Sequence, residues 1–266
     1  MKIALLEVKG TSPGYYGLLA VLTLAAAIGM GAAWYMEHHG HIATGMNNQI
    51  VWGLPHVFAV FLVVAASGAL NVASMASVFG KTEFKPLAPL SGVLAIALLI
   101  GGLTILMLDL GRPDRLIVAM TYYNFKSIFA LNIFLYSGFM GFVIVYLWTM
   151  MERSMNRFTP LAGLAAFVWR MALTTGTGSI FGFLVARQAY DSALLAPLFI
   201  VLSFGWGLAV FLLVQATMFA WEGERLDPAV QRRMARLLGI FIAASLYLVA
   251  VVHLTHLYHA KQVAFE

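Results

Sequence analysis

Long apolar runs, separated by short polar connections, make up most of the chain. Seven of them stand out, at residues 14–36, 51–79, 90–109, 128–151, 161–186, 193–221 and 237–258. A helix that crosses a bilayer needs roughly 20 such residues, whereas barrel strands alternate over about 10 residues, and no such alternation occurs. Because only helices and closed barrels satisfy backbone polar groups in lipid, the pattern predicts an all-α transmembrane bundle. We expect about seven spanning helices, within a range of seven to eight.

The composition supports a single integral membrane domain over residues 1–266. Of these residues 62% are hydrophobic and 10% are charged, against about 25% charged in a soluble domain, so lipid must cover part of the surface. The chain has no cysteine, which excludes cysteine-ligated iron–sulfur clusters, c-type haem attachment and disulfides within it. The net charge of +5 arises in the connections, which indicates membrane orientation and argues against nucleic-acid binding.

Lys and Arg residues are unevenly divided between alternate connections. One set has ten, namely Lys2, Lys9, Lys81, Lys85, Arg153, Arg157, Arg225, Arg232, Arg233 and Arg236, and the other has five, namely Arg112, Arg115, Lys126, Arg187 and Lys261. This difference predicts a multi-pass protein with its N-terminus in the cytoplasm. The membrane we expect is the bacterial cytoplasmic (inner) membrane. The connection 111–126 is an exception to this distribution, because it carries three positive charges on the predicted outer side. We expect a docked partner there, and a short interfacial helix within the connection.

Ionisable residues at membrane depth are costly and point to function. His56 lies about five residues into the second apolar run, just after Pro55. It is either an interfacial histidine with one hydrogen bond, or a donor to a ligand carbonyl, or a haem ligand. The ordinary pKa of a histidine suits proton exchange near neutrality.

Asp109 closes the third apolar run, where a carboxylate opposes the helix dipole. We therefore expect a compensating partner, and Arg112 is the nearest candidate. Gly111 can take the left-handed conformation that ends a helix, and Pro113 prevents continuation. The group is either a helix stop held by an ion pair or an acid–base couple at the mouth of a site, and the two interpretations are compatible.

Other polar residues are expected at the same membrane face. They are Asn48, Tyr122, Tyr123 and Asn124, although at least one tyrosine fits an aromatic belt. A small lipophilic molecule that exchanges protons fits this face, and a quinone is such a molecule. Arg170, inside the fifth run, is equally compatible with structural anchoring and with a proton path.

Three short stretches resemble the polysulfide reductase membrane-subunit family (NrfD/PsrC type). They are DLGRP at 109–113, NFKS at 124–127 and WGLP at 52–55. The resemblance covers residues 51–157 well, which would hold the quinone site. Over the remaining helices, 158–266, it rests on hydropathy and on HLTHLY at 253–258. Members commonly have eight or more helices in two four-helix halves, and this chain offers seven.

The resemblance implies a quinone-reactive membrane subunit of a respiratory oxidoreductase complex, and not a stand-alone enzyme. It would bind menaquinone or ubiquinone without haem or iron–sulfur cluster of its own. A ferredoxin-like iron–sulfur subunit would link it to a molybdopterin or multihaem catalytic subunit. The predicted catalytic residues are His56, Asp109 and Arg112, and the predicted quinone-binding residues are Asn48, His56, Asp109, Arg112, Tyr122 and Tyr123. The motif carries Asp109 and Arg112, and it does not itself fix His56 or Asn48.

Two other functions compete with this one. A b-type cytochrome subunit would use His56 with His253 or His256 as haem ligands. A transporter or a structural anchor is the other rival, but the sequence has no clear inverted repeat or pair of broken helices of the kind transporters use. The terminal substrate, the quinone type and the direction of electron flow do not follow from the sequence.

Overall fold

The computed structural model describes residues 12–47, 49–50, 52–184, 187, 190–222 and 227–258. The α-helices are α1 (Pro13–His39), α2 (Leu54–Ala69), α3 (Asn71–Ser77), α4 (Ala88–Leu108), α5 (Leu116–Thr121), α6 (Ile128–Met151), α7 (Thr159–Gly182), α8 (Leu195–Glu222) and α9 (Pro228–Tyr258). Short 3-10 helices lie between them, at η1 (His41–Thr44), η2 (Thr82–Leu87), η3 (Pro113–Arg115) and η4 (Arg153–Phe158). The described part of the chain has no strand, and the all-α class is confirmed.

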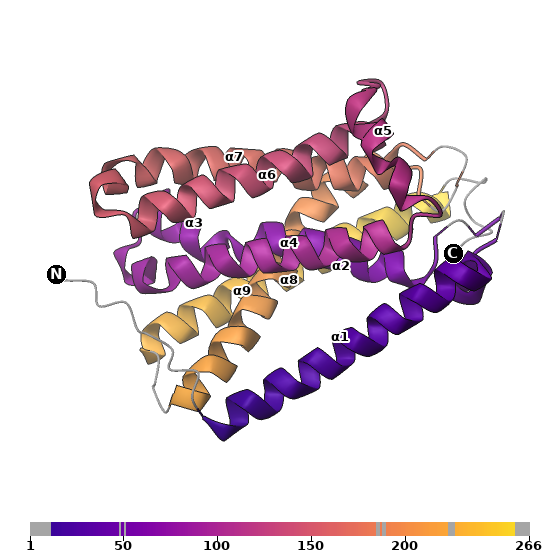
Figure 1. Ribbon diagram of the computed structural model, residues 1–266. Helices are drawn as coiled ribbons and strands as arrows, with labels where there is room; N and C mark the ends of the chain where they lie inside the picture. Colours follow the sequence, from indigo (N-terminus) through magenta and orange to yellow (C-terminus); the bar gives the residue numbers. More distant parts are fainter. Residues whose placement is uncertain are drawn as a thin grey trace.

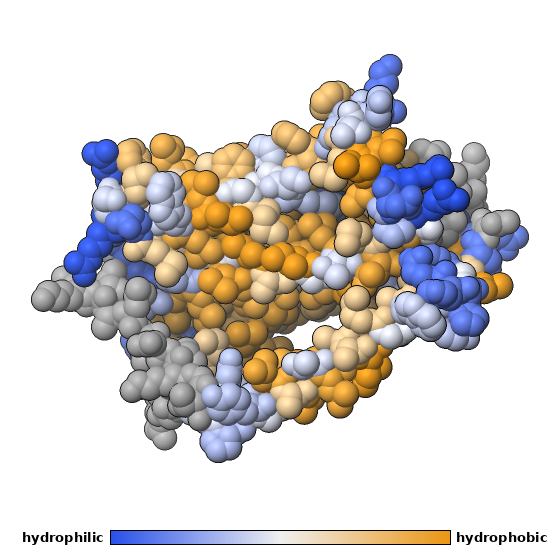
Figure 2. All heavy atoms as spheres, viewed as in Figure 1, coloured by the Kyte–Doolittle hydropathy of each residue, from blue (hydrophilic) through white to orange (hydrophobic). Residues whose placement is uncertain are grey.

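The predicted transmembrane bundle is confirmed as well. Six helical segments are long and apolar enough to cross a membrane, with α2 and α3 counted as one segment. The other predicted span corresponds to α7, which has 24 residues like α6 but is less apolar. Its polar and small residues lie inside the bundle, where α6 and α8 pack against it. Figure 2 shows the opposite pattern on the outside, where apolar residues form a broad band between polar ends.

The span formed by α2 and α3 is the centre of the bundle. It packs against α4, α7 and α8, while α6 lies against α4 and α7, and α9 lies against α8. Within an 18-residue apolar window, 72% of this span is buried. The closest helix crossing is between α2 and α8, because a Cβ added at Gly68 would lie 1.6 Å from the Ser203 carbonyl oxygen. Glycines at this crossing let the two backbones touch.

The central span is interrupted in the middle, between α2 and α3. The Ser91 hydroxyl, from α4, donates to the Ala69 carbonyl oxygen at 2.6 Å and accepts from the Ala73 N–H at 3.1 Å. It therefore stands between the donor and acceptor of one helical hydrogen bond, which is a known cause of helix kinks. No pattern in the sequence indicates this break, and one discontinuous helix is now evident where none was expected.

Helix α1 stands apart from the other helices. Figure 1 shows it running obliquely beside the bundle, and none of its 18-residue apolar window is buried. Apolar side chains cover it on all sides, including Leu22, Ile28 and Trp34, each more than half exposed. A helix that is apolar all round requires a nonpolar environment, and lipid provides one.

The connection between α4 and α6 projects from one end of the bundle. It contains η3 and the short helix α5, which Figure 1 shows standing outside the helix layer. The expected short helix is thus present. The expected left-handed Gly111 is not, because the described glycines with positive φ are Gly40, Gly45 and Gly80. Helix α4 ends instead at Asp109, whose φ and ψ are −90° and −1°.

Candidate functional site

His56 and Asp109 lie against each other at one end of the bundle. His56 is in the first turn of α2, and Asp109 directly follows α4. Since α2 and α4 are neighbours that run in opposite directions, the start of one helix meets the end of the other. The imidazole Nδ1 of His56 is in close ion-pair contact with Oδ2 of Asp109.

The helix ends explain how each charge is tolerated. A carboxylate is unfavourable at the C-terminus of its own helix, and an imidazolium is unfavourable at the N-terminus of its own. Here Asp109 lies beside the positive end of α2, and His56 lies beside the negative end of α4. The favourable dipole of the neighbouring helix therefore offsets the unfavourable dipole of each residue's own helix.

The pair is buried unequally. The side chain of Asp109 is 1% exposed and that of His56 is 21% exposed. Apart from the contact with His56, neither carboxylate oxygen of Asp109 has a hydrogen-bond partner within the described residues. A buried carboxylate usually has all its acceptors occupied, and Oδ1 of Asp109 is an exception among the described residues. The arrangement can hold a proton between two groups and pass it to a third.

The expected pairing of Asp109 with Arg112 is not what the structure shows. Arg112 precedes η3 and its side chain is exposed, whereas Asp109 contacts His56. Tyr122 is 82% exposed, and Tyr123 packs on the ring of Phe125 at 5.3 Å. These residues lie in the projecting connection, at the same end of the bundle as the pair. Asn48 lies outside the described residues.

Aromatic rings beside His56 were not anticipated as part of the site. Trp52 lies 5.9 Å from the imidazole, between ring centroids. Its indole contacts Phe181 of α7 at 5.3 Å and Tyr190 at 6.3 Å. The one local signal that the sequence contains is that Trp52 lies only four residues before His56, in the segment that leads into α2. Phe181 and Tyr190 come from distant segments and carry no signal of their own.

Arg170 has a different environment in the middle of the bundle. Its guanidinium donates from one nitrogen to the Ser67 carbonyl at 2.9 Å and to Asn71 Oδ1 at 2.7 Å. The rings of Phe167 and Phe204 lie 4.8 and 5.3 Å from its Cζ. These acceptors lie at the α2–α3 break, where the end of α2 supplies partial negative charge. The contacts link α7 to α2 and α8, as the anchoring interpretation expects.

Two histidines near the end of α1 turn back onto their own helix. His38 Nδ1 contacts the Trp34 carbonyl at 2.8 Å, and His39 Nδ1 contacts the Tyr35 carbonyl at 3.0 Å. Within the described residues no group of three His, Cys, Asp or Glu side chains is placed to hold a metal ion. His256, at the same end of the bundle, is buried in α9.

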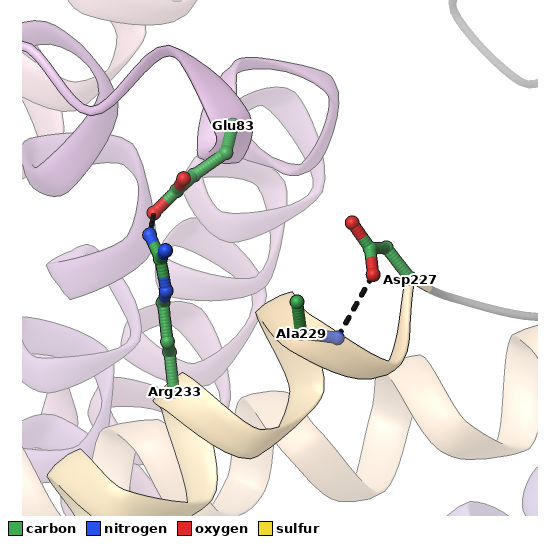
Figure 3. A network of polar contacts seen from close by, with 4 residues as sticks. All are labelled: Glu83, Asp227, Ala229 and Arg233. Carbon is green, nitrogen blue, oxygen red and sulfur yellow. Dashed lines mark hydrogen bonds and ion pairs between the residues drawn. The ribbon is translucent and has the colours of Figure 1, made fainter.

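The opposite end of the bundle is basic. Figure 3 shows Arg233 of α9 paired with Glu83 of η2, beside the Asp227 carboxylate that accepts from the Ala229 N–H at 2.8 Å and caps α9. Further exposed Lys and Arg side chains surround this ion pair, namely Lys81, Lys85, Arg232 and Arg236. An excess of positive charge of this kind is the basis of the expectation that this end faces the cytoplasm.

Comparison with known proteins identifies the family. The family model described as polysulphide reductase, NrfD, matches residues 43–265, which include both His56 and Asp109. The chain belongs to the NrfD family. Helix α1 precedes the matched region, whereas every helix that packs in the bundle lies within it.

Several relatives are membrane subunits of reductases. The chain is 30% identical over 250 residues to the Hdr-like menaquinol oxidoreductase integral membrane subunit of Archaeoglobus fulgidus, covering 91% of this chain and 62% of the relative. It is 29% identical to a putative dimethyl sulfoxide reductase membrane subunit of Halobacterium salinarum, covering 90% and 60%. It is 27% identical over 191 residues to one of the polysulfide reductase chains of Wolinella succinogenes, covering 65% and 60%. The protein thus spans about 60% of the length of these relatives.

Proposed function

We propose that this chain is a quinone- or quinol-reactive membrane subunit of a multi-subunit respiratory oxidoreductase. The observation that carries the proposal is the His56–Asp109 pair, a buried acid–base couple at one membrane face. Support comes from the family, in which one relative is named as a menaquinol oxidoreductase subunit. A bound quinone or quinol supplies two-electron, two-proton redox chemistry at such a site.

The residues present fit a quinone headgroup. A quinone carbonyl needs a hydrogen-bond donor, and a quinol hydroxyl needs an acceptor. With Nδ1 held by Asp109, the imidazole Nε2 of His56 can serve as either, depending on protonation. Leu54, Val57 and Phe58, on the same turns of α2, are more than half exposed. They place the site beside lipid, from which a hydrophobic tail can enter.

His56 and Asp109 share the proton work in this proposal. His56 takes a proton from the ligand hydroxyl or returns it, and Asp109 balances the imidazolium charge. Oδ2 of the buried carboxylate contacts Nδ1 of His56. Asp109 therefore orients the imidazole, as a carboxylate does for a catalytic histidine. General acid–base groups of this kind contribute about 10²–10⁴-fold to a rate.

The test uses the complex that co-purifies with the chain. Electron transfer from menadiol or decylubiquinol to the partner's redox centres should fall by roughly 100-fold or more in His56→Gln. The matched control is His39→Gln, since His39 is at the same end of the bundle but bonds to its own helix. Unchanged transfer in His56→Gln, with both quinols, would remove the proposal.

The absorption spectrum of the same sample separates this function from the haem rival. A reducible Soret band that belongs to this chain and disappears in His56→Gln would make it a b-type cytochrome. A spectrum without such a band, combined with saturable binding of the quinol, supports the quinone function.

The projecting connection is the proposed docking surface for an iron–sulfur partner on the outer side of the membrane. Its exposed side chains combine apolar and positive character, as in Ile117, Phe125, Arg115 and Lys126. Aromatic anchors and arginines are typical of protein interfaces. The double variant Arg115→Gln/Lys126→Gln should lower the yield of the complex on co-purification. The double variant Arg153→Gln/Arg157→Gln, at the opposite end, is the control, and equal yields would contradict the docking site.

A further inference from the structure

Four aromatic side chains from separate segments form a cluster that contacts His56 through Trp52. Trp52 precedes α2, Phe181 is near the end of α7, Tyr190 is in the connection after it, and Phe199 is in α8. Phe181 meets the indole of Trp52 edge-on, at 70°, and also contacts Tyr190 at 5.6 Å and Phe199 at 5.3 Å. Edge-to-face pairs at these separations are attractive. The indole is therefore held from the side by rings that do not belong to its own segment.

The backbone that carries Trp52 is also fixed. A Cβ added at the next residue, Gly53, would lie 3.0 Å from the Met46 side chain and 3.2 Å from the Thr44 carbonyl oxygen. The chain before α2 thus rests directly on the turn that follows α1. With its backbone and its ring both restrained, Trp52 cannot easily turn away from His56.

Trp52 and Asp109 therefore both lie against the imidazole of His56. The ring centroids of Trp52 and His56 are 5.9 Å apart and tilted by 32°, within the approximately 6 Å over which a cation is attracted to an indole face. The two rings are tilted and not stacked, so the indole limits the motion of the imidazole from one side. The His56 side chain is 21% exposed, so its neighbours do not enclose the imidazole on every side.

We propose that Trp52 is a positioning residue, which keeps His56 turned towards Asp109 with the support of Phe181 and Tyr190. The proposal deepens the quinone function and relies on it for its kinetic readout. It predicts that Trp52 acts through His56 and does not itself determine how tightly the quinol binds.

The kinetic test uses menadiol with the intact complex. Trp52→Ala should lower kcat by roughly tenfold, because small misplacement of an acid–base group is costly, while KM changes by less than about twofold. Trp52→Phe should recover most of the rate. In a His56→Gln background, Trp52→Ala should have no further effect, since the two residues act as one unit. An equal loss in that background, or a loss confined to KM, would overturn the proposal.

A spectroscopic test needs no quinol. A protonated imidazole quenches the fluorescence of a nearby indole, so Trp52 should report the titration of His56. The ring of Trp34 lies 4.2 Å from that of His38 and would give a similar signal, so the measurement uses a Trp34→Phe background. The pH-dependent component should disappear in both Trp52→Phe and His56→Gln. Its persistence in His56→Gln would contradict the proposed contact.

The outcomes separate this inference from the proposed function. If His56→Gln leaves electron transfer intact, the quinone function fails, whatever the fluorescence shows. If His56→Gln abolishes transfer while Trp52→Ala matches the wild type, only the positioning role fails. Should Trp52→Ala not assemble, Phe181→Leu takes its place, because it removes the edge-on support and should lower kcat in the same direction. A wild-type kcat in Phe181→Leu, together with no pH-dependent quenching in the Trp34→Phe protein, would likewise overturn the positioning role.

Discussion

The end of the bundle that carries His56 and Asp109 and the middle of the bundle hold buried charge in two different ways. At that end, Asp109 contacts an ionisable partner, His56, and its Oδ1 has no partner among the described residues. In the middle, Arg170 meets carbonyl and amide oxygens and two aromatic rings, all of them neutral. A pair with two titratable members and a free acceptor can move a proton. A guanidinium that binds only neutral groups links helices, so we expect the first region to serve chemistry and the second to serve architecture.

The largest effect on stability is expected at Arg170. Arg170→Ala leaves the Ser67 carbonyl and the Asn71 amide without their donor and opens a cavity between three helices. The expected loss is about 3–5 kcal/mol, measured as thermal unfolding of the purified complex in detergent. The control is Arg187→Ala, an exposed arginine in the connection after α7. An Arg170→Ala protein of wild-type stability that had lost quinol-linked activity would place Arg170 on a functional path instead.

At Asp109 we expect the reverse balance. Asp109→Asn keeps the volume of the side chain, but the neutral amide cannot balance the charge of a protonated His56. Quinol-linked turnover should therefore fall by about 100-fold. Stability should be unchanged or slightly higher, because functional sites commonly cost stability. Asp114→Asn, an exposed acid in η3, is the matched control. A large drop in melting temperature with full activity per folded molecule would assign Asp109 to architecture and dissolve the contrast.

The sequence predicts the spanning helices and points to the two titratable residues of the first region. Apolar runs define spanning helices because lipid permits little else, and a carboxylate or imidazole inside such a run stands out at once. Hence His56 and Asp109 were both found. The contact between them does not follow from the sequence. The candidate partner nearest to Asp109 along the chain is Arg112, whereas the antiparallel packing of α2 and α4 brings His56 to Asp109.

The middle of the bundle was harder to predict for a physical reason. The break between α2 and α3 depends on Ser91, a hydroxyl supplied by another helix, and nothing near residue 70 in the sequence marks it. The aromatic rings around Trp52 come together in the same way, from α7 and the connection after it. Contacts between distant segments follow from packing and are not encoded in local periodicity.

A smaller effect should separate packing from polar contacts in the middle region. A Cβ added at Gly207 of α8 would lie 2.0 Å from the Gly68 carbonyl carbon, whereas one at Gly205 would lie 3.8 Å from the nearest atom, in Phe241. Gly207→Ala should therefore force α2 and α8 apart and cost about 1–3 kcal/mol, read as a lower melting temperature. Gly205→Ala should be close to neutral. If the two variants behave alike, the close crossing does not limit stability.

The smallest effect is expected at Ser91, although its hydroxyl makes two hydrogen bonds at the α2–α3 break. In Ser91→Ala the Ala73 N–H and the Ala69 carbonyl lose their shared partner, but these two groups are four residues apart and can bond to each other. The break should then close locally, at a net cost below about 1 kcal/mol. Ser137→Ala, whose hydroxyl bonds to its own helix at 2.9 Å and is exposed, is the control for removing a helix hydroxyl. A cost as large as that of Arg170→Ala would mean that α2 cannot re-form its own bond, and that the break is imposed by the surrounding helices and not by Ser91.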